Sequence, residues 1–428
     1  MPLSKSGTRL FDRGTQVLLK QVNDSTVKTW LDGAAMGQYL TYKYHNHNLP
    51  QYTGDTTTII PATSDREFWH KYFWLIKNAL GGQLTTVAGT FTTALNGLRV
   101  GPHDAWARDI QYACFKNYRE AQDQIVRDML DMAKAHGCYV TLNLAGGGAE
   151  ASSAFGVGPI FVPGTEAFNR LVQYEADFIN AYGDHDAVAM FDLMNEPNNL
   201  THTVNGNWVS RWWYDKYGEN WETAYLNWKN ALVTGVKAKL TINPKPLITV
   251  GNSWVMIYNP SYQVILDRAR AHAENLDVVC EHPYDKVEAD ANIVRAQSLS
   301  NDIGKPWFFE EYGFNGTDAE PWYSYWPWFD QIASQRGLNT ATMVLWGMTS
   351  TTGRVIPAYP GYPVPQSVMD SIPPVGEEPG PEPEPEPRPV SYALPAMLMI
   401  PFFGGLAYIG YRSMKKRPYQ ARVRARSI

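Results

Sequence analysis

Two glutamates stand where apolar stretches of the chain end, and such a pair of carboxyl groups could do acid–base chemistry. Glu196 follows the apolar stretch 187–194 and precedes Pro197, and Glu311 ends the stretch 306–311. Buried parallel strands end in this way when their last residues face a ligand. A single glutamate there also fits an ordinary polar strand end, so the prediction depends on the two together.

Glycoside hydrolysis uses two carboxyl groups on different strand ends. One is protonated and helps the leaving oxygen depart, and the other is ionised and attacks the sugar carbon, so their environments must differ. The neighbouring Glu310 competes with Glu311 for the second role, but strand alternation lets only one of them point into a barrel mouth. Glu311 is closer to the strand end and is preferred. Glu310 is expected to face the helix layer or the flank of the strand.

Strand and helix patterns alternate along the chain. Strands are predicted at 16–23, 97–100, 139–144, 187–194, 246–251, 277–282, 306–311 and 342–347. Amphipathic helices are predicted between them, the first opening at the capping box Ser64-Asp65-Arg66-Glu67 and others ending near Gly137 and Gly183. Eight such units predict an α/β protein, a (β/α)8 TIM barrel with its site at the carboxyl ends of the strands. The alternative is an open doubly wound sheet, but no glycine-rich phosphate turn follows the first strand.

In a barrel these strand ends would bring together one set of polar and aromatic residues: Arg99, Asn143, Asn195, Glu196, Asn252, His282, Tyr284, Glu311 and Trp346. The set resembles the glycoside hydrolases of family 5, in the clan of retaining (β/α)8 enzymes that includes cellulases and β-mannanases. The resemblance covers about residues 10–360. It rests on five motifs in order: Leu98-Arg99-Val100, Met194-Asn195-Glu196-Pro197, His282-Pro283-Tyr284, Lys305-Pro306-Trp307-Phe308-Phe309-Glu310-Glu311-Tyr312-Gly313 and Leu345-Trp346-Gly347.

The resemblance implies that Glu196 is the acid/base and Glu311 the nucleophile. It also implies that Arg99 supports the nucleophile electrostatically and that Tyr284 touches and orients it. A positive charge and a hydrogen bond both favour an ionised carboxyl group, so these two residues are expected to keep Glu311 ionised. The two carboxyl groups are then expected to lie about 5 to 5.5 Å apart, which gives retention of anomeric configuration.

The resemblance implies substrate-binding roles as well. Asn195 would hydrogen-bond the sugar hydroxyl next to the reacting carbon, His282 would line the mouth near the acid/base, and Trp346 would form a stacking floor. Taken singly, Arg99 could equally be a core ion pair and Trp346 ordinary packing. Four further tryptophans could line distal sugar subsites or pack a loop: Trp208, Trp212, Trp213 and Trp221.

The third strand departs from the common pattern of the family. Many members end it in a motif with Asp and His, whereas this chain reads Leu142-Asn143-Leu144-Ala145-Gly146-Gly147-Gly148. Mannanase-like members resemble the chain more, because they have an asparagine at the position of Asn143, which we include among the substrate-binding residues. His103 could occupy the place of the absent histidine, or it could be a simple loop residue.

Composition limits the partners. The net charge is −5, and residues 412–428 contribute seven basic and no acidic side chains, so the rest carries 30 basic against 42 acidic residues, or −12. A surface this acidic argues against nucleic acid as a partner. Cys114, Cys138 and Cys280 are expected to be buried free thiols, and His45 and His47 to belong to a polar loop. No metal and no organic cofactor is expected, because two carboxyl groups suffice.

The C-terminal part has its own organisation. Residues 1–372 are predicted to form the catalytic domain, and 373–389 a proline- and glutamate-rich linker that acts as a semi-rigid spacer. Residues 390–411 contain no charged side chain and are long enough for a single transmembrane helix. The basic residues 412–428 then predict a cytoplasmic tail by the positive-inside rule. A buried apolar helix and a processed sorting signal are the alternatives.

This topology predicts a single-pass protein of the cell membrane with an extracellular catalytic domain. No apolar export signal is visible at the N-terminus. Sequons at Asn23, Asn199 and Asn315 permit glycosylation but do not establish an exterior location.

The sequence thus predicts a retaining endo-β-1,4-glycanase that hydrolyses a β-linked polysaccharide, such as cellulose, another β-glucan or mannan. The alternative from a different class is a catalytically silent, membrane-anchored carbohydrate-binding protein on the same scaffold.

Overall fold

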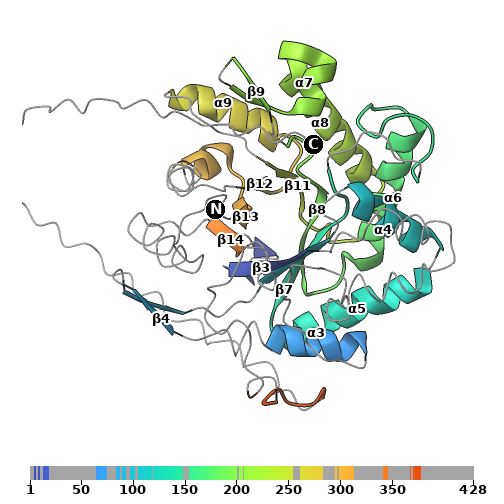
Figure 1. Ribbon diagram of the computed structural model, residues 1–428, viewed down its shortest axis with the longest axis vertical. Helices are drawn as coiled ribbons and strands as arrows, with labels where there is room; N and C mark the ends of the chain where they lie inside the picture. The colour runs from blue at the N-terminus through green and yellow to red at the C-terminus, as the bar shows by residue number, and fades with distance from the viewer. Residues whose placement is uncertain are drawn as a thin grey trace, which may run out of the picture. The chain divides into compact units, whose positions relative to one another are not determined.

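Eight parallel strands close into a barrel in the computed structural model (Figure 1). Around the barrel the order is β11-β12-β13-β14-β3-β6-β7-β8. Their bounds are β3 Arg13–Leu18, β6 Gly97–Gly101, β7 Tyr139–Asn143, β8 Val188–Asn195, β11 Ile248–Asn252, β12 Val279–Glu281, β13 Trp307–Tyr312 and β14 Ala341–Leu345. Each predicted strand overlaps one of these. Closure of the sheet confirms the predicted barrel and excludes the open doubly wound alternative.

The structure describes part of the chain, within one compact unit, Met1–Pro381. The described residues are 4–5, 8–9, 13–18, 64–74, 83–86, 89–92, 97–101, 105–117, 119–147, 154–199, 202–205, 207–253, 261–282, 295, 298–312, 341–345, 367 and 370–376. For β3, β6, β14 and the part of β13 after Trp307, only the backbone is described. The predicted linker beyond 376, the helix 390–411 and the tail 412–428 lie outside these residues, as do His45 and His47. Within the described ranges, none of the helices has the length and apolar character needed to span a bilayer.

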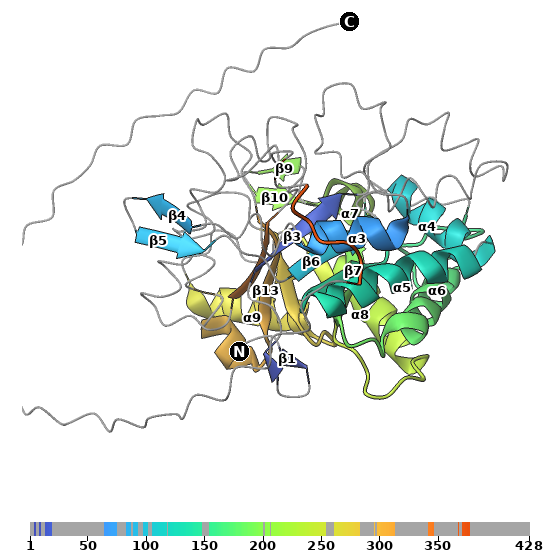
Figure 2. The same cartoon turned by 90° about the horizontal axis from the view of Figure 1, so that it is seen from below.

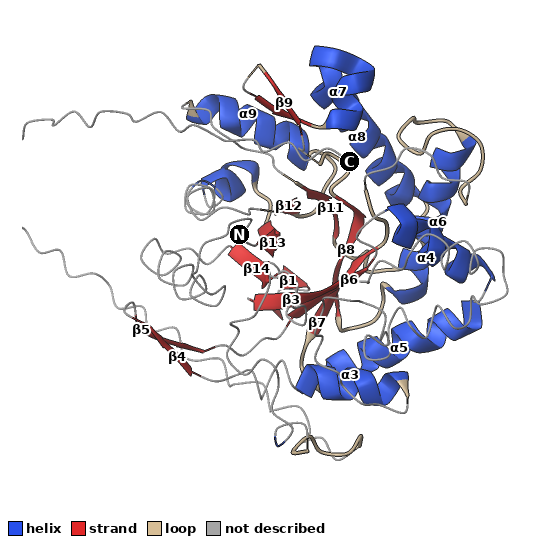
Figure 3. Cartoon of the chain, in the orientation of Figure 1, coloured by secondary structure: helices blue, strands red, loops and turns tan. Residues whose placement is uncertain are grey.

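The described helices lie outside the strands, above, to the right and below in the view coloured by secondary structure (Figure 3). They are α3 Asp65–Trp74, α4 Ala105–Asn117, α5 Arg119–Ala135, α6 Glu166–Tyr182, α7 Arg211–Tyr217, the short 3₁₀ helix η3 Gly218–Asn220, α8 Trp221–Ala238 and α9 Tyr262–Ala273. Helix α5 packs on β7 and α6 on β8, and the two helices lie side by side in the view from below (Figure 2). The sequence did not predict α4 or three two-stranded pairs: β1 Ser4–Lys5 with β2 Thr8–Arg9, β4 Gln83–Thr86 with β5 Gly89–Thr92, and β9 His202–Val204 with β10 Asn207–Val209.

Side-chain caps and close packing set the helix ends. The backbone N–H of Glu67 donates to Ser64 Oγ at 3.2 Å, as the predicted capping box requires. In the same way the Phe168 N–H donates to Thr165 Oγ1 at 3.1 Å at the start of α6. That helix ends at Gly183, where an added Cβ would lie 2.7 Å from the backbone carbonyl oxygen of Ile179 and 2.5 Å from Ile242 Cδ1. Glycine is therefore required there by space.

The core fills the layer between strands and helices. One large cluster contains mostly aromatic and branched side chains, and a second consists of Ala189, Met190, Val278 and Cys280. The second cluster comes only from the barrel strands and the residue before β12, so it is the packed interior of the barrel. All three cysteines are buried and free, as predicted.

Lysines bind the carboxyl end of α9 at the amino ends of the strands. Lys229 Nζ donates to the carbonyl oxygens of Ala271, His272 and Glu274 at 3.3, 2.6 and 3.1 Å. Lys305 Nζ donates to the carbonyls of residues 273 and 276 at 2.6 and 2.7 Å. The last carbonyls of a helix have no partner within the helix, and cations are favoured there. These side chains therefore complete the hydrogen bonding of α9.

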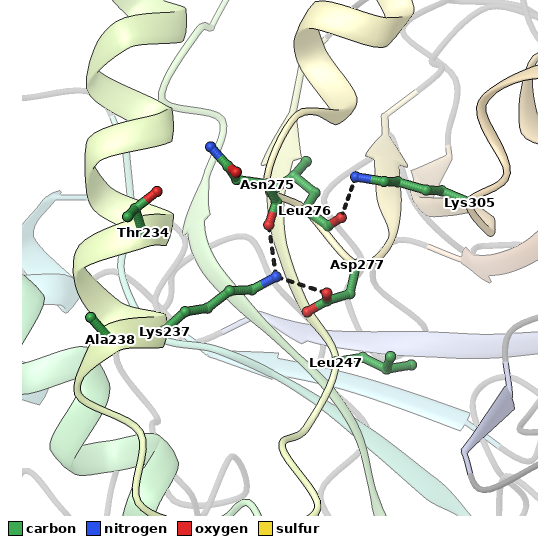
Figure 4. Close-up of a pocket in the computed structure, with 8 residues that line it drawn as sticks. All are labelled: Thr234, Lys237, Ala238, Leu247, Asn275, Leu276, Asp277 and Lys305. Atoms are coloured by element: carbon green, nitrogen blue, oxygen red, sulfur yellow. Dashed lines mark hydrogen bonds and ion pairs between the residues drawn. The ribbon is translucent and has the colours of Figure 1, made fainter.

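A pocket of about 830 Å³ lies beside this helix end (Figure 4). Lys237 and Lys305 approach it from opposite sides, and Lys237 Nζ contacts the Asn275 carbonyl oxygen and Asp277 Oδ1, both at 2.7 Å. Leu247 and Asp277, which also line it, precede β11 and β12. The pocket therefore lies at the end of the barrel opposite Glu196.

Replacing Lys229 should destabilise the fold. Its side chain is fully buried, so Lys229→Met leaves three carbonyl groups at the end of α9, one of them buried, without this donor. We expect a loss of about 2 to 4 kcal/mol in the free energy of unfolding, measured by urea denaturation. Lys239→Met, at an exposed position just after α8, is the matched control and should change stability by less than about 0.5 kcal/mol. Equal stability of the two variants would contradict the capping role.

An ion-pair cluster joins the first turn of α8 to the carboxyl-terminal half of α9. Glu222 Oε1 accepts hydrogen bonds from Arg268 Nε and from His272 Nε2, the latter at 2.8 Å. Burial lowers the pKa of His272 to about 4, against the raising effect of Glu222. Burial alone would raise the pKa of Glu222, but the hydrogen bond from His272 and the charge of Arg268 lower it to about 2. Neutral His272 therefore donates to ionised Glu222 at neutral pH.

This cluster should make the protein sensitive to acid. Below pH 6.5 the unfolded chain binds a proton at His272 that the folded chain does not, and below pH 4.5 the same holds for Glu222. Stability should therefore fall as the pH falls from 6.5 towards 4, by an amount on the order of 2 kcal/mol for His272, and fall further as Glu222 is protonated. Thermal unfolding of the wild type and of His272→Gln between pH 7 and 4 measures this. The variant should show the shallower dependence, and identical slopes would contradict the assignment.

Candidate active site

Glu196 is the first residue after β8 and has an unusual backbone. Its φ is 43°, in the left-handed region, which costs a non-glycine residue about 1 to 2 kcal/mol. Two backbone hydrogen bonds hold it there: its N–H donates to the Gly251 carbonyl at 2.8 Å, and its carbonyl accepts from the Asn199 N–H at 3.1 Å. Strain maintained in this way is found mainly at functional sites.

Both oxygens of the Glu196 carboxyl group have partners. Oε1 lies 2.9 Å from Nδ1 of His282, and Oε2 accepts from Asn199 Nδ2 at 3.0 Å. The His282 side chain is fully buried, whereas that of Glu196 keeps 14% exposure. His282 directly follows β12, so the barrel brings together two residues far apart in the sequence. Their contacts fix the plane of a carboxyl group that solvent can still reach.

The backbone of Asn195 is bonded to the end of β7. Its N–H donates to the Ala145 carbonyl, and its carbonyl accepts from the Gly147 N–H, both at 2.8 Å. A Cβ on Gly147 would lie 2.3 Å from the Asn195 carbonyl oxygen and 2.7 Å from that of Glu196. Gly147 therefore allows a backbone approach that no side chain permits.

The short turn after Glu196 is held from the helix side. Trp213 Nε1 donates to the Pro197 carbonyl at 2.8 Å, and Asn198 Oδ1 accepts from the Ser253 N–H at 2.9 Å. Trp213 is 1% exposed and Asn198 is also buried. The turn is thus fixed to both α7 and the residue after β11.

Two predicted tryptophans of this region belong to the core. Trp213 and Trp221 are 1% and 7% exposed, and Trp213 packs against Phe161 and Trp228 with ring centroids 5.4 and 5.7 Å apart. They pack the loop and do not form sugar subsites. Trp212 is partly buried, with Lys216 Nζ 4.9 Å from its ring centroid. The side chain of Trp208 lies outside the described residues.

The two asparagines that end β7 and β11, Asn143 and Asn252, have different surroundings. Asn143 is buried as the last residue of β7 and pairs in register with Asp192. Asn252 faces the helix layer, because its Oδ1 accepts a hydrogen bond from the hydroxyl of Tyr225 on α8. Its amide also donates to the Cys280 carbonyl at 3.4 Å. Asn252 therefore joins β11 to β12 and α8.

The second predicted carboxyl group is placed only by its backbone. The parallel registers relate Asn195 to Gly251, Gly251 to Cys280 and Cys280 to Phe308. Glu311 lies three residues beyond Phe308 in β13, so it belongs to the same end of the barrel as Glu196. Its side chain and that of Glu310 lie outside the described residues, and the expected carboxyl separation stays a prediction. The side chains of Arg99, His103, Tyr284 and Trp346 lie outside them as well.

Asn199 is the residue of this site that sequence reasoning missed. In the sequence it stands out only as the start of a sequon, yet its side-chain amide donates a hydrogen bond to Glu196 Oε2. The signal was its spacing, since a residue three positions after Glu196 returns to it across one tight turn. Nothing among the described residues groups three or more histidine, cysteine, aspartate or glutamate side chains as a metal site would.

A closed parallel barrel with a strained, hydrogen-bonded glutamate at the carboxyl end of a strand defines a (β/α)8-barrel enzyme site. The family model described as "Cellulase (glycosyl hydrolase family 5)" matches residues 95–350, more than half of the chain. The chain belongs to this family and is a glycoside hydrolase. The family resemblance predicted from the motifs is thereby confirmed.

Solved structures similar to this one are also glycan-degrading enzymes. The endo-1,4-β-D-mannanase of Thermotoga petrophila RKU-1 is 16% identical, with 60% of this chain and 81% of that chain covered and a TM-score of 0.43. The β-1,4-mannanase of the sea hare Aplysia kurodai is 14% identical, with 81% and 90% covered and a TM-score of 0.46. The family 5 enzyme of Prevotella bryantii B14, solved with a xyloglucan tetradecasaccharide, is 16% identical, with 78% and 87% covered and a TM-score of 0.45. No curated protein matches the chain by sequence.

Filling the space at Gly147 should displace the end of β8. In Gly147→Ala the new methyl group meets the carbonyl oxygens of Asn195 and Glu196, which are backbone atoms and cannot rotate away. We expect a loss of about 1 to 3 kcal/mol in unfolding free energy, measured by urea denaturation. The control is Gly235→Ala on α8, where the nearest atom is a methyl group of Val172 at 3.0 Å. It should change stability by less than about 1 kcal/mol, and a Gly147 variant no weaker than this control would contradict the close approach.

Proposed function

We propose that this glycoside hydrolase is a retaining endo-β-1,4-glycanase that cleaves a β-glucan or a mannan. The observation that carries the proposal is the placement of Glu196. It stands at the carboxyl end of β8 with its carboxyl plane fixed by His282 and Asn199 and its edge open to solvent. A family 5 domain around this site supports a two-carboxyl mechanism.

In the first step, the carboxylate of Glu311 attacks the anomeric carbon while the glycosidic C–O bond breaks. Glu196 gives its proton to the departing oxygen, and a glycosyl ester forms on Glu311. In the second step, Glu196 takes a proton from water as the water oxygen attacks the same carbon. The ester bond to Glu311 breaks, and both glutamates return to their starting state. Two displacements at one carbon retain its configuration.

His282 and Asn199 serve Glu196 in both steps. A carboxyl group that alternates between acid and base must keep one orientation towards the substrate oxygen while its charge changes. Asn199 Nδ2 can donate to either state of Oε2, and Nδ1 of His282 can accept or donate according to its tautomer. His282 and Asn199 therefore keep the Glu196 carboxyl group in one orientation whether it is protonated or ionised. Asn143, Asn195, Arg99, Tyr284 and Trp346 are proposed to bind the sugar or support Glu311.

The same proposal includes the location of the enzyme. Residues 390–411, uncharged and followed by a basic tail, anchor the chain in the cell membrane, and the linker 373–389 holds the domain 1–372 outside. Polysaccharide would then be cut close to the cell that takes up the products.

Removal of either carboxyl group tests the reaction. Glu196→Gln and Glu311→Gln should each lower kcat on β-glucan or mannan by at least 100-fold, because each removes one proton-transfer or nucleophilic function. Proton NMR of the first product formed by the wild type should show the β-anomer. Glu120→Gln, an exposed glutamate on α5, is the control and should keep full activity. An initial α-anomer would contradict retention, and a wild type that binds glycan without cleaving it would favour the silent binding protein.

A further inference from the structure

The strand that carries Glu196 contains a β-bulge directly before it. Between β8 and β11 the register pairs Thr249 with Asp192 and Gly251 with Asn195. Two steps along β11 therefore match three steps along β8, so β8 has one extra residue relative to β11. On the other side, Asn143 pairs with Asp192 and Gly146 with Asn195, so the register with the β7 side is kept. Because side chains alternate with a period of two, the extra residue reverses the faces of the following side chains relative to β11. The directions of Asn195 and Glu196 thus depend on the bulge.

The carboxylate of Asp192 supplies the hydrogen bonds that the bulge interrupts. Asp192 Oδ1 accepts from the backbone N–H of Met194 at 3.1 Å and from that of Gly251 at 2.7 Å. One bond lies within the bulged strand and the other crosses to its neighbour. Asp192 is fully buried, so both donors are kept away from water. A carboxylate acceptor gives shorter and stronger bonds to N–H groups than a neutral carbonyl does.

Gly251 connects Asp192 to Glu196. Its N–H donates to Asp192 Oδ1 at 2.7 Å, and its carbonyl accepts from the Glu196 N–H at 2.8 Å. The position and tilt of the Gly251 residue therefore depend on Asp192 on one side and determine the amide of Glu196 on the other. The strained φ of Glu196 is maintained through this connection.

A second buried carboxyl group interacts electrostatically with Asp192. Glu175 on α6 is fully buried, and neither of its carboxyl oxygens has a hydrogen-bond partner among the described residues. Burial raises the pKa of Glu175 well above its usual value, the negative charge of Asp192 raises it further, and Arg108 on α4 opposes this. Glu175 therefore favours its neutral form beside Asp192.

We propose that Asp192 is a positioning residue for the acid/base: its carboxylate builds the bulge in β8 and, through Gly251, aims the carboxyl group of Glu196 at the glycosidic oxygen. The inference rests on the proposed function of Glu196. Asp192 itself touches neither substrate nor the reacting atoms.

A leaving-group comparison separates positioning from a general structural defect. Proton donation by Glu196 matters for a sugar leaving group, but 2,4-dinitrophenolate departs without a proton. The readout is kcat/KM, which reports the first step, on two substrates with the sugar that the wild type accepts. One is the natural oligosaccharide and the other the 2,4-dinitrophenyl β-glycoside. In Asp192→Ala we expect a fall of 30-fold or more on the oligosaccharide and of less than 3-fold on the aryl glycoside.

Two further variants complete the experiment. Asp192→Asn keeps an acceptor oxygen but cannot carry a negative charge. We expect its kcat/KM to fall 3- to 10-fold on the oligosaccharide and to change less on the aryl glycoside. This variant provides the test if the alanine variant does not fold. Glu175→Gln mimics the neutral carboxyl group and has no bond to the bulge, so both substrates should be cleaved as by the wild type. No loss in the Asp192 variants, or an equal loss on both substrates, would overturn the positioning role. If instead the wild type cleaves neither substrate, or Glu196→Gln remains fully active, the proposed function itself fails.

Discussion

The structure depends on how the end of β8 is held between its two neighbours. Asn195 is bonded to the residues that follow β7, and Glu196 to Gly251 in β11, so the carboxyl-bearing residue is fixed from both sides. A barrel closed by eight parallel strands provides two such neighbours for every strand end. This allows a glutamate to keep an unfavourable backbone conformation and still present its side chain to solvent.

The two ends of the barrel differ in function: the carboxyl ends form the site, and the amino ends stabilise the fold. At the carboxyl ends, Glu196 meets His282 and Asn199, and the backbone approaches so closely that Gly147 admits no side chain. At the amino ends, the buried Lys229 and the partly buried Lys305 complete the hydrogen bonding of α9. The carboxyl end therefore presents a strained glutamate whose side chain is partly exposed, while the lysine contacts at the amino end contribute stability. This division is typical of (β/α)8 enzymes.

Buried polar groups connect the helix layer to the site without reaching the substrate. Trp213 donates a hydrogen bond to the Pro197 carbonyl, and the Tyr225 hydroxyl donates to Asn252 Oδ1. Asp192 accepts a hydrogen bond from the Gly251 N–H at the bulge before Glu196. Each of these groups would be costly to bury without its partner. Their partners are backbone or strand-end atoms around Glu196, so the packing of the helices and the geometry of the acid/base are parts of one arrangement.

The sequence by itself determined the barrel, the family and the position of Glu196 along the chain. It could do so because apolar periodicity, a glutamate-proline strand end and the order of motifs are local properties. Only the tertiary structure decided which polar residues meet. Asn199 and His282 contact Glu196, whereas Asn252 turns to the helix layer and Trp213 packs in the core. The period-two pattern also gave no sign of the bulge at Asp192, because an extra residue is visible only against the register of the neighbouring strand. Contacts of this kind join residues up to 86 positions apart, and barrel closure is the physical reason they form.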